Sequence, residues 1–297
     1  MTAAPTVRSG TASACGSCGE LVQGVLPDGQ AFQVTMPMDV FSSAHVVARQ
    51  REDWVALSHP RDRTKAAAAA LATAQHLGSP PLHLTVTIDS TIPIGAGLGS
   101  STADVVATVR ATATALAAVL TPNEIGSIAG AIEPTDGTMH RGMCVTDRRG
   151  RLLEAWPWTP TFHVVVLVPE GRGVATEAVA LDRQREWASA YAELLDGLRV
   201  AAHLRDPRPF IEAAATSAAL HQEVLANDLL ARAPALARDT GAAGWNIAHT
   251  GTALGLLFAE PDRATTVATT LPSRPGLAGV RAFRATTLTG RSDPTCR

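Results

Sequence analysis

The chain has 297 residues, which is enough for about two domains or for one large domain built from two parts. A formal net charge of −2 and a pI near 6.5 give no indication of a nucleic-acid or anionic-membrane partner, and 46% hydrophobic against 18% charged residues exclude a disordered chain. Lys65 is the only lysine, which excludes a Walker A loop with its Gly-Lys-Ser/Thr ending and a Schiff-base lysine at any other position.

The N-terminal segment has no basic stretch followed by an apolar run of signal-peptide length, and no later apolar stretch approaches the roughly 18 residues of a membrane span. We therefore expect a soluble protein. Four cysteines, at positions 15, 18, 144 and 296, are too few for a disulfide scaffold and predict a cytoplasmic location. Cys15 and Cys18 form a CxxC pair without a second such pair, so we interpret them as small residues in a tight turn and not as a zinc or redox site.

The first elements in chain order are predicted strands. From Phe32 the segment FQVTMPMDVFSSAHVVA is rich in apolar positions, and Pro37 and Asp39 predict a turn that joins two strands within it. The Ala-rich stretch 65–77 contains no Gly or Pro and predicts a packing helix that stops at Gly78. Residues 82–89 alternate apolar and polar side chains, which is typical of a half-buried strand.

A glycine-rich loop, PIGAGLGSST at residues 93–102, follows this strand and precedes a predicted helix over 103–120. A second helix is predicted from about Thr121, because Thr-Pro-Asn-Glu supplies a cap, a first-turn proline and an early acid, and it ends before Glu133. The remaining predicted elements are a buried strand at 162–168, helices at 176–204 and 209–230, a strand at 254–258 and a frayed tail at 289–297.

The glycine loop is the strongest chemical signal in the chain. Glycines at 95, 97 and 99 permit a tight turn and a close approach of backbone N–H groups to a ligand, and the helix that follows attracts an anion such as phosphate at its N-terminus. A glycine turn that only packs a helix against a sheet is the alternative for a generic pattern of this kind. A dinucleotide site fits poorly, because no acidic residue lies near Ala117, about 20 residues beyond Gly97.

Three segments of the chain resemble the GHMP kinase superfamily, named for galactokinase, homoserine, mevalonate and phosphomevalonate kinases. Pro93 followed by Gly97-Leu98-Gly99-Ser100-Ser101 looks like the ATP-binding loop of that family. Gly19-Glu20 looks like its first motif, and residues 249–257 resemble its third, glycine-rich motif. Together the three segments span most of the chain.

Finer details resemble the L-threonine kinases of adenosylcobalamin biosynthesis, a branch of this superfamily: SCGELVQG at 17–24, SSTAD at 100–104, EPTDG at 133–137 and AHTGT at 248–252. The resemblance implies conversion of L-threonine and ATP into O-phospho-L-threonine and ADP, with Mg²⁺ as cofactor. It also implies an α+β fold with an N-terminal mixed β-sheet, helices and the nucleotide loop over 1–155. A C-terminal ferredoxin-like α/β sandwich over 156–297 would complete it, with the active site between the two parts.

The resemblance assigns candidate roles to individual residues. Ser101, on the first helical turn, and Glu133 are the candidate Mg²⁺ ligands, although Glu133 could equally cap a turn. The candidate ATP-binding residues are Pro93, Gly95, Gly97, Leu98, Gly99, Ser100, Ser101 and Thr102. The candidate substrate-binding residues are Glu20, Thr135, His249, Thr250, Gly251 and Thr252. A lone histidine is more often structural, and Glu20 is either a partner of the substrate ammonium or an acid at a helix N-terminus.

Asp136 is the candidate catalytic residue, since it matches the acidic residue that faces the acceptor hydroxyl in the family. Without the family context, Asp136-Gly137 would be interpreted as an ordinary turn. Several relatives pair this aspartate with a lysine near the first motif. The present chain has no lysine there, and Arg8 and Arg141 are the substitutes that the sequence offers. Asp136 therefore acts either as a base or as a charge that orients the hydroxyl.

The expected partner is a small-molecule amino acid, with no nucleic acid and no membrane, and a homodimer is compatible with the sequence. Two alternatives to an L-threonine kinase stay open. One is a GHMP kinase for another small alcohol, such as L-serine, homoserine or a secondary-metabolite intermediate. The other is a catalytically silent member that binds a ligand and regulates, against which the intact GLGSS loop and Asp136 argue.

Overall fold

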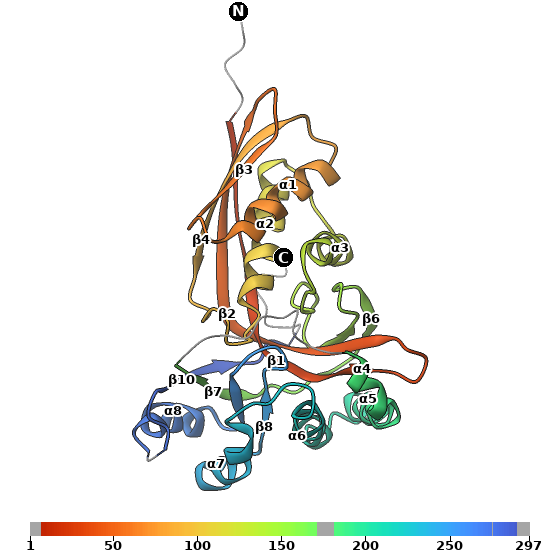
Figure 1. The fold of residues 1–297 in the computed structure, drawn as a ribbon, viewed down its shortest axis with the longest axis vertical. Helices are drawn as coiled ribbons and strands as arrows, with labels where there is room; N and C mark the ends of the chain where they lie inside the picture. Colours follow the sequence, from red (N-terminus) through yellow and green to blue (C-terminus); the bar gives the residue numbers. More distant parts are fainter. Residues whose placement is uncertain (1–6, 171–180, 275, 290–297) are drawn as a thin grey trace, which may run out of the picture.

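The computed structural model describes residues 7–170, 181–274 and 276–289, and it consists of two sheets with helices packed on them (Figure 1). The strands of the N-terminal sheet are β1 (Val7–Val25), β2 (Ala31–Gln50), β3 (Val55–His59), β4 (Leu82–Ser90), β5 (Cys144–Thr146) and β6 (Leu152–Ala155). They are ordered β3-β4-β2-β5-β6, with β1 pairing β2 off that path. Because β3 runs parallel to β4 and the other pairs are antiparallel, the sheet is mixed, as predicted.

The C-terminal sheet has the order β10-β7-β9-β8 and is antiparallel. Its strands are β7 (His163–Pro169), β8 (Gly244–Ile247), β9 (Leu254–Phe258) and β10 (Val280–Thr286). Its helices are α4 (Leu181–Gln184), α5 (Ala188–Leu204), α6 (Arg208–His221), α7 (Ala233–Thr240) and α8 (Pro261–Thr270), and α5 to α8 lie on one side of the sheet in Figure 1. The strand order and the alternation with helices are those of a ferredoxin-like sandwich, which confirms the predicted α+β fold class.

The predicted turn at Pro37 and Asp39 is wrong, because β2 is one continuous strand of 20 residues. Its partner β1 absorbs the irregularity instead, through register shifts between Cys15 and Val22. Such shifts let a strand bend without ending. Pro37 lies opposite Ser17 in this region, and its carbonyl accepts a hydrogen bond from Leu288 N. The tight turn expected at Cys15 and Cys18 is also wrong, because both residues lie within the strand β1.

Two helices pack on the N-terminal sheet, α1 (Thr64–His76) and α2 (Ser100–Ala115), and α3 (Pro122–Ile132) packs on both of them. The prediction for α1 is confirmed, and Gly78 follows it with a φ of 65°. The helix α2 begins at Ser100 and ends five residues before the predicted Leu120, because the chain turns at Ala117 with a φ of 57°. At α3 a capping box joins Thr121 and Glu124, as the sequence indicated.

In the C-terminal half, the predicted strands at 162–168 and 254–258 are confirmed as β7 and β9. The sequence analysis missed β8, β10, α7 and α8. The predicted helix at 209–230 is shorter than expected and ends at His221. Of the predicted helix at 176–204, residues 176–180 lie outside the described residues, and the rest consists of α4, a 3₁₀ turn and α5. The predicted frayed tail lies outside them from residue 290 onward.

One hydrophobic cluster crosses between the two halves. It includes Phe32 and Val46 of the N-terminal sheet and Val164, Tyr191 and Phe210 of the C-terminal half. The β1–β2 hairpin reaches the C-terminal helices, as Figure 1 shows, and Gly24 packs directly on the Tyr191 ring of α5. A division of the chain at residue 155 stays a prediction. No described helix is long and apolar enough to cross a membrane.

Candidate active site

The glycine loop ends directly at the N-terminus of α2. Gly95, Gly97 and Gly99 have φ values of 73°, 77° and 68°, a region that residues with a Cβ rarely adopt, so three glycines are required here. Gly99 is the residue before the helix, and no side chain caps its first turn. The first N–H groups of a helix have no partner within it, and they carry the positive end of the helix dipole. The loop therefore presents backbone donors toward an anion.

The third motif packs against this loop. The carbonyl of Ala96 accepts hydrogen bonds from Thr252 N at 3.2 Å and from Ala253 N at 3.1 Å. A Cβ on Gly251 would lie 2.3 Å from Ala96 O and from Gly97 N, so the two backbones approach as closely as only glycine allows. The segment at 250–253 thus fixes the shape of the glycine loop. Thr250 lies at the partly exposed rim of this junction.

Asp136 lies beside the last glycine of the loop. A Cβ on Gly99 would be 2.7 Å from Asp136 Oδ2 and 2.9 Å from Ser17 Oγ, and the Ser17 hydroxyl donates to Asp136 Oδ2 at 3.0 Å. The backbone N–H of Asp136 donates to Thr102 Oγ1 at 3.3 Å, which ties the turn after α3 to the first turn of α2. Thr135, also predicted in the site, is buried and donates from its hydroxyl to Thr102 Oγ1 at 3.4 Å. The structure therefore brings the first motif, the glycine loop and Asp136 together.

Glu20 and Asp136 form a pair of neighbouring carboxyl groups, of which Glu20 is buried and Asp136 is partly buried. Glu20 lies on β1 and is 4% exposed, which excludes the alternative of an acid at a helix N-terminus. Burial, followed by the charge of Asp136, raises the pKa of Glu20 well above its ordinary value, and burial also raises the pKa of Asp136. Hydrogen bonds from the Ser17 hydroxyl and from Glu20 lower the pKa of Asp136 and so oppose the effect of burial. We assign the proton of the pair to Glu20, which leaves Asp136 as the carboxylate.

Glu20→Gln is expected to increase stability at alkaline pH. Because the folded-state pKa of Glu20 is raised, the folded protein holds a proton that the unfolded chain releases, and stability is lost as pH rises through the folded-state pKa. An amide stays neutral and still donates toward Asp136. The melting temperature of the variant should therefore exceed that of the wild type at about pH 8, by about 2–4 °C for each kcal/mol gained, and should approach it at about pH 5. An equal difference at both pH values would contradict the assigned proton.

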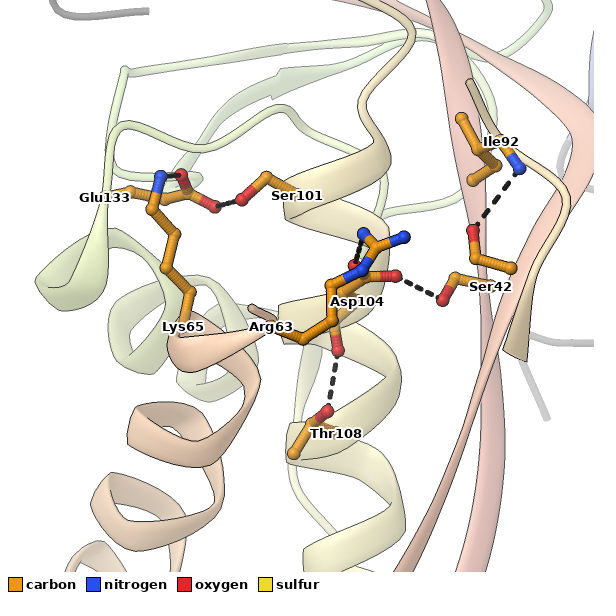
Figure 2. A network of polar contacts seen from close by, with 9 residues as sticks. Ser42, Arg63, Lys65, Ile92, Ser101, Asp104, Thr108 and Glu133 are labelled. Carbon is orange, nitrogen blue, oxygen red and sulfur yellow. Dashed lines mark hydrogen bonds and ion pairs between the residues drawn. The ribbon is translucent and has the colours of Figure 1, made fainter. Parts of the chain in front are cut away.

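Ser101 at the start of α2 contacts Glu133, as Figure 2 shows. The Ser101 hydroxyl donates to Glu133 Oε1 at 2.5 Å, and Lys65 Nζ lies 2.5 Å from Glu133 Oε2. Glu133 is buried and follows the last residue of α3. A hydroxyl and a carboxylate in contact form the all-oxygen donor set that suits Mg²⁺, which takes few protein ligands and completes its shell with phosphate and water. Among the described residues, no group of three or more His, Cys, Asp or Glu side chains could hold a metal ion.

Sequence reasoning missed the basic residues at this position. Lys65 and Arg63 come from the start of α1, a helix interpreted only as a packing element, and Arg63 pairs with Asp104 on α2. Asp104 also accepts a hydrogen bond of 2.5 Å from Ser42 on β2, and burial raises its pKa. Lys65 is conspicuous by its rarity, but the sequence contains no signal for its contact with Glu133, which lies 68 positions away.

His249 points away from the loop and into the C-terminal half. Its Nε2 lies 3.0 Å from Ser217 Oγ, and its carbonyl accepts from His221 Nε2 at 2.6 Å. Burial lowers the pKa of His249 well below its ordinary value, and burial lowers the pKa of His221 to about 4. Both rings are therefore neutral at pH 7. This geometry favours the structural alternative for His249 over direct substrate contact.

Neither arginine proposed as a substitute for the family lysine is placed beside Asp136 by the described contacts. Arg8 lies opposite Ala48 at the outer end of β1, nine residues and roughly 30 Å from Ser17 along the strand. Arg141 lines a cavity together with Arg110 and Met139, and Asp136 does not belong to the lining of that cavity. The described partners of the Asp136 carboxylate are instead the Ser17 hydroxyl and the Glu20 carboxyl.

Comparison with known proteins points to one family. Residues 64–144, which contain Lys65, the glycine loop and Asp136, match the family described as GHMP kinases N terminal domain. An L-threonine kinase of Salmonella typhimurium is 28% identical over 247 residues, covering 82% of this chain and 80% of that protein. An L-threonine kinase of Citrobacter freundii is also 28% identical, over 260 residues covering 82% of this chain and 84% of that protein.

Solved structures agree with this fold. Mevalonate kinase of Methanococcus jannaschii superposes with a TM-score of 0.68 at 15% identity, covering 97% of this chain and all of that one. A structure described as MDDEF in complex with MVAPP, AMPPCP and magnesium superposes with a TM-score of 0.72 at 15% identity, covering 96% and 98%. The predicted resemblance is confirmed: residues 64–144 match the GHMP kinases N terminal domain, and the fold is that of the mevalonate kinase structure. The Salmonella and Citrobacter relatives are both L-threonine kinases.

Proposed function

We propose that the protein is an ATP- and Mg²⁺-dependent kinase that phosphorylates the side-chain hydroxyl of L-threonine, giving O-phospho-L-threonine and ADP. The observation that carries this proposal is the contact between Asp136 and Gly99, which sets a carboxylate beside a loop of backbone donors. Phosphoryl transfer needs such a pairing, since the acceptor hydroxyl must be oriented where the terminal phosphate is held. The choice of threonine is supported by the two L-threonine kinases to which the chain is similar.

The glycine loop binds the nucleotide in this proposal. Backbone N–H groups between Gly97 and Thr102 donate to the phosphates, and the dipole of α2 favours their negative charge. Pro93 and Gly95 shape the entry of the loop, and the buried Leu98 anchors it. Ser101 and Glu133 would hold Mg²⁺, which when bound neutralises phosphate charge.

Asp136 faces the acceptor. The threonine hydroxyl oxygen forms a bond to the γ-phosphorus, the bond from that phosphorus to the β–γ bridging oxygen breaks, and ADP leaves with that oxygen. The hydroxyl proton passes to the Asp136 carboxylate. Ser17 orients this carboxylate by its hydrogen bond, and Glu20 keeps it ionised by holding the proton of the pair. No lysine beside Asp136 is required in this arrangement.

Glu20 and Thr135 are the proposed contacts with the amino-acid substrate, because Glu20 lies beside Asp136 and Thr135 directly precedes it in the chain. The segment Thr250 to Thr252 closes the site next to the loop, and His249 supports that segment through Ser217 and His221. The three cysteines among the described residues are buried thiols, which supports the proposed cytoplasmic location.

The substrate assignment is tested by measuring ADP release from the purified protein with L-threonine, L-serine, L-homoserine and ethanolamine. We expect turnover with L-threonine to exceed turnover with each of the others at equal concentration. Turnover on another alcohol without turnover on L-threonine would overturn the substrate while keeping the kinase. Binding of ATP without turnover on any of them would favour the silent regulator.

A further inference from the structure

The start of α1 faces the start of α2, and two cations point into the space between them, Arg63 directly before α1 and Lys65 in its first turn (Figure 2). Lys65, the second residue of α1, has a half-exposed side chain, and its ammonium contacts a Glu133 carboxylate that is almost fully buried. The flexible stem of an exposed lysine lets the ammonium move, whereas Glu133 is held in place by Ser101. The only lysine of the chain therefore ends at the proposed Mg²⁺ ligands.

Arg63 behaves differently from Lys65. Its guanidinium pairs with Asp104, which the Ser42 hydroxyl holds from the opposite side. Its side chain is mostly buried, and its Nε has no hydrogen-bond partner in the part of the chain that the structure describes. A buried donor without a partner costs free energy unless a ligand or water satisfies it. Arg63 is thus a fixed cation with an unused donor.

These groups line one cavity of about 190 Å³, together with Ser100, Ser101 and Ile94. The cavity combines an ammonium, a guanidinium, two serine hydroxyls and the free N–H groups at the start of α2. Two carboxylates line the cavity, the exposed Asp62 and the buried Asp104, and Asp104 is paired with Arg63. Lys65 is paired with Glu133, which lies next to the cavity lining. The donors that remain suit a phosphorylated ligand.

We propose that Lys65 binds the terminal phosphates of the nucleotide, exchanging its contact with Glu133 for a phosphate oxygen, while Arg63 fixes the wall of the phosphate site. This inference rests on the proposed kinase function and adds a residue to its nucleotide site. It also explains how a chain without a Walker A lysine or a lysine beside Asp136 still brings an ammonium to the phosphates. The terminal phosphates are favoured because Lys65 shares Glu133 with Ser101, the candidate metal ligand.

The test is isothermal titration of ATP, ADP and AMP into the full-length wild type and into Lys65→Ala and Lys65→Arg, each with EDTA and with Mg²⁺. Losing one charge-assisted contact should weaken ATP and ADP binding by roughly tenfold or more and leave AMP binding within about twofold. Lys65→Arg should recover most of the affinity, because it keeps the charge. Arg208→Ala is the matched control, since Arg208 also begins a helix and pairs with a carboxylate, Asp206, at 2.6 Å.

Unchanged ATP and ADP affinities in Lys65→Ala, or an equal loss for AMP, would overturn the phosphate contact. A lower melting temperature with unchanged affinities would reduce Lys65 to a structural ion pair with Glu133. If Lys65→Ala fails to fold, the comparison of Lys65→Gln with Lys65→Arg decides in the same way. A wild type that binds none of the three nucleotides would overturn the proposed function itself, which separates that failure from failure of the lysine assignment.

Discussion

Asp136→Asn is expected to lower kcat by about 10²–10⁴-fold while ATP binding survives. The amide keeps the oxygen that accepts from the Ser17 hydroxyl, so the local structure beside Gly99 is preserved. It removes the negative charge that orients and deprotonates the acceptor hydroxyl. The measurement is steady-state kinetics with L-threonine and ATP, combined with titration of ADP to show that the nucleotide site is intact.

Asp147→Asn is the matched control for this variant. Asp147 is also a carboxylate, but it accepts hydrogen bonds from Arg149 N and Arg151 N within its own turn. Its replacement should lower the melting temperature without a selective loss of kcat. In the wild type, burial raises the pKa of Asp136, so the acid side of the profile of kcat/KM against pH should lie above the ordinary range of aspartate. A kcat for Asp136→Asn within about twofold of the wild type would remove Asp136 from the reaction.

Local patterns in the sequence predicted those parts of the fold that local patterns determine. The cap at Thr121 predicted the bounds of α3 to within about a residue. The alternation of apolar and polar residues before the glycine loop did the same for β4. The glycine loop was also predictable, because three closely spaced glycines correspond to three positive φ values. These features depend on neighbours within a few residues, which a single sequence displays directly.

The parts that could not be predicted depend on distant pairing. Pro37 marks a break by its chemistry, yet β2 continues because β1 shifts register opposite it, and the sequence does not show which strand is the partner. Lys65 and Glu133 are brought together only when α1, α2 and α3 pack on one another. The burial of Glu20 against Asp136 is of the same kind, and it changes the interpretation of both carboxyls. The tertiary contacts, more than the motifs, therefore decide the electrostatics of the site.

Gly251→Ala is expected to reduce nucleotide affinity and stability together, because the third motif and the glycine loop share one backbone junction. A Cβ at this position would lie 2.3 Å from Ala96 O, 2.3 Å from Gly97 N and 2.4 Å from Ala96 C, all of them backbone atoms. Backbone cannot rotate away as a flexible side chain does, so the loop itself must shift. Overpacking of this kind costs about 1–3 kcal/mol, and the shift displaces the N–H groups that face the phosphates.

Gly197→Ala supplies the control for a glycine that only weakens a helix. Gly197 lies within α5, and a Cβ there would have no atom within 4 Å. Alanine in that helix should increase stability by about 0.5–1 kcal/mol and leave ADP binding unchanged. Thermal unfolding and ADP titration of both variants therefore separate the two effects of an added methyl group. If Gly251→Ala unfolded and bound ADP like the wild type, the contact between the third motif and the loop would not determine the geometry of the phosphate site.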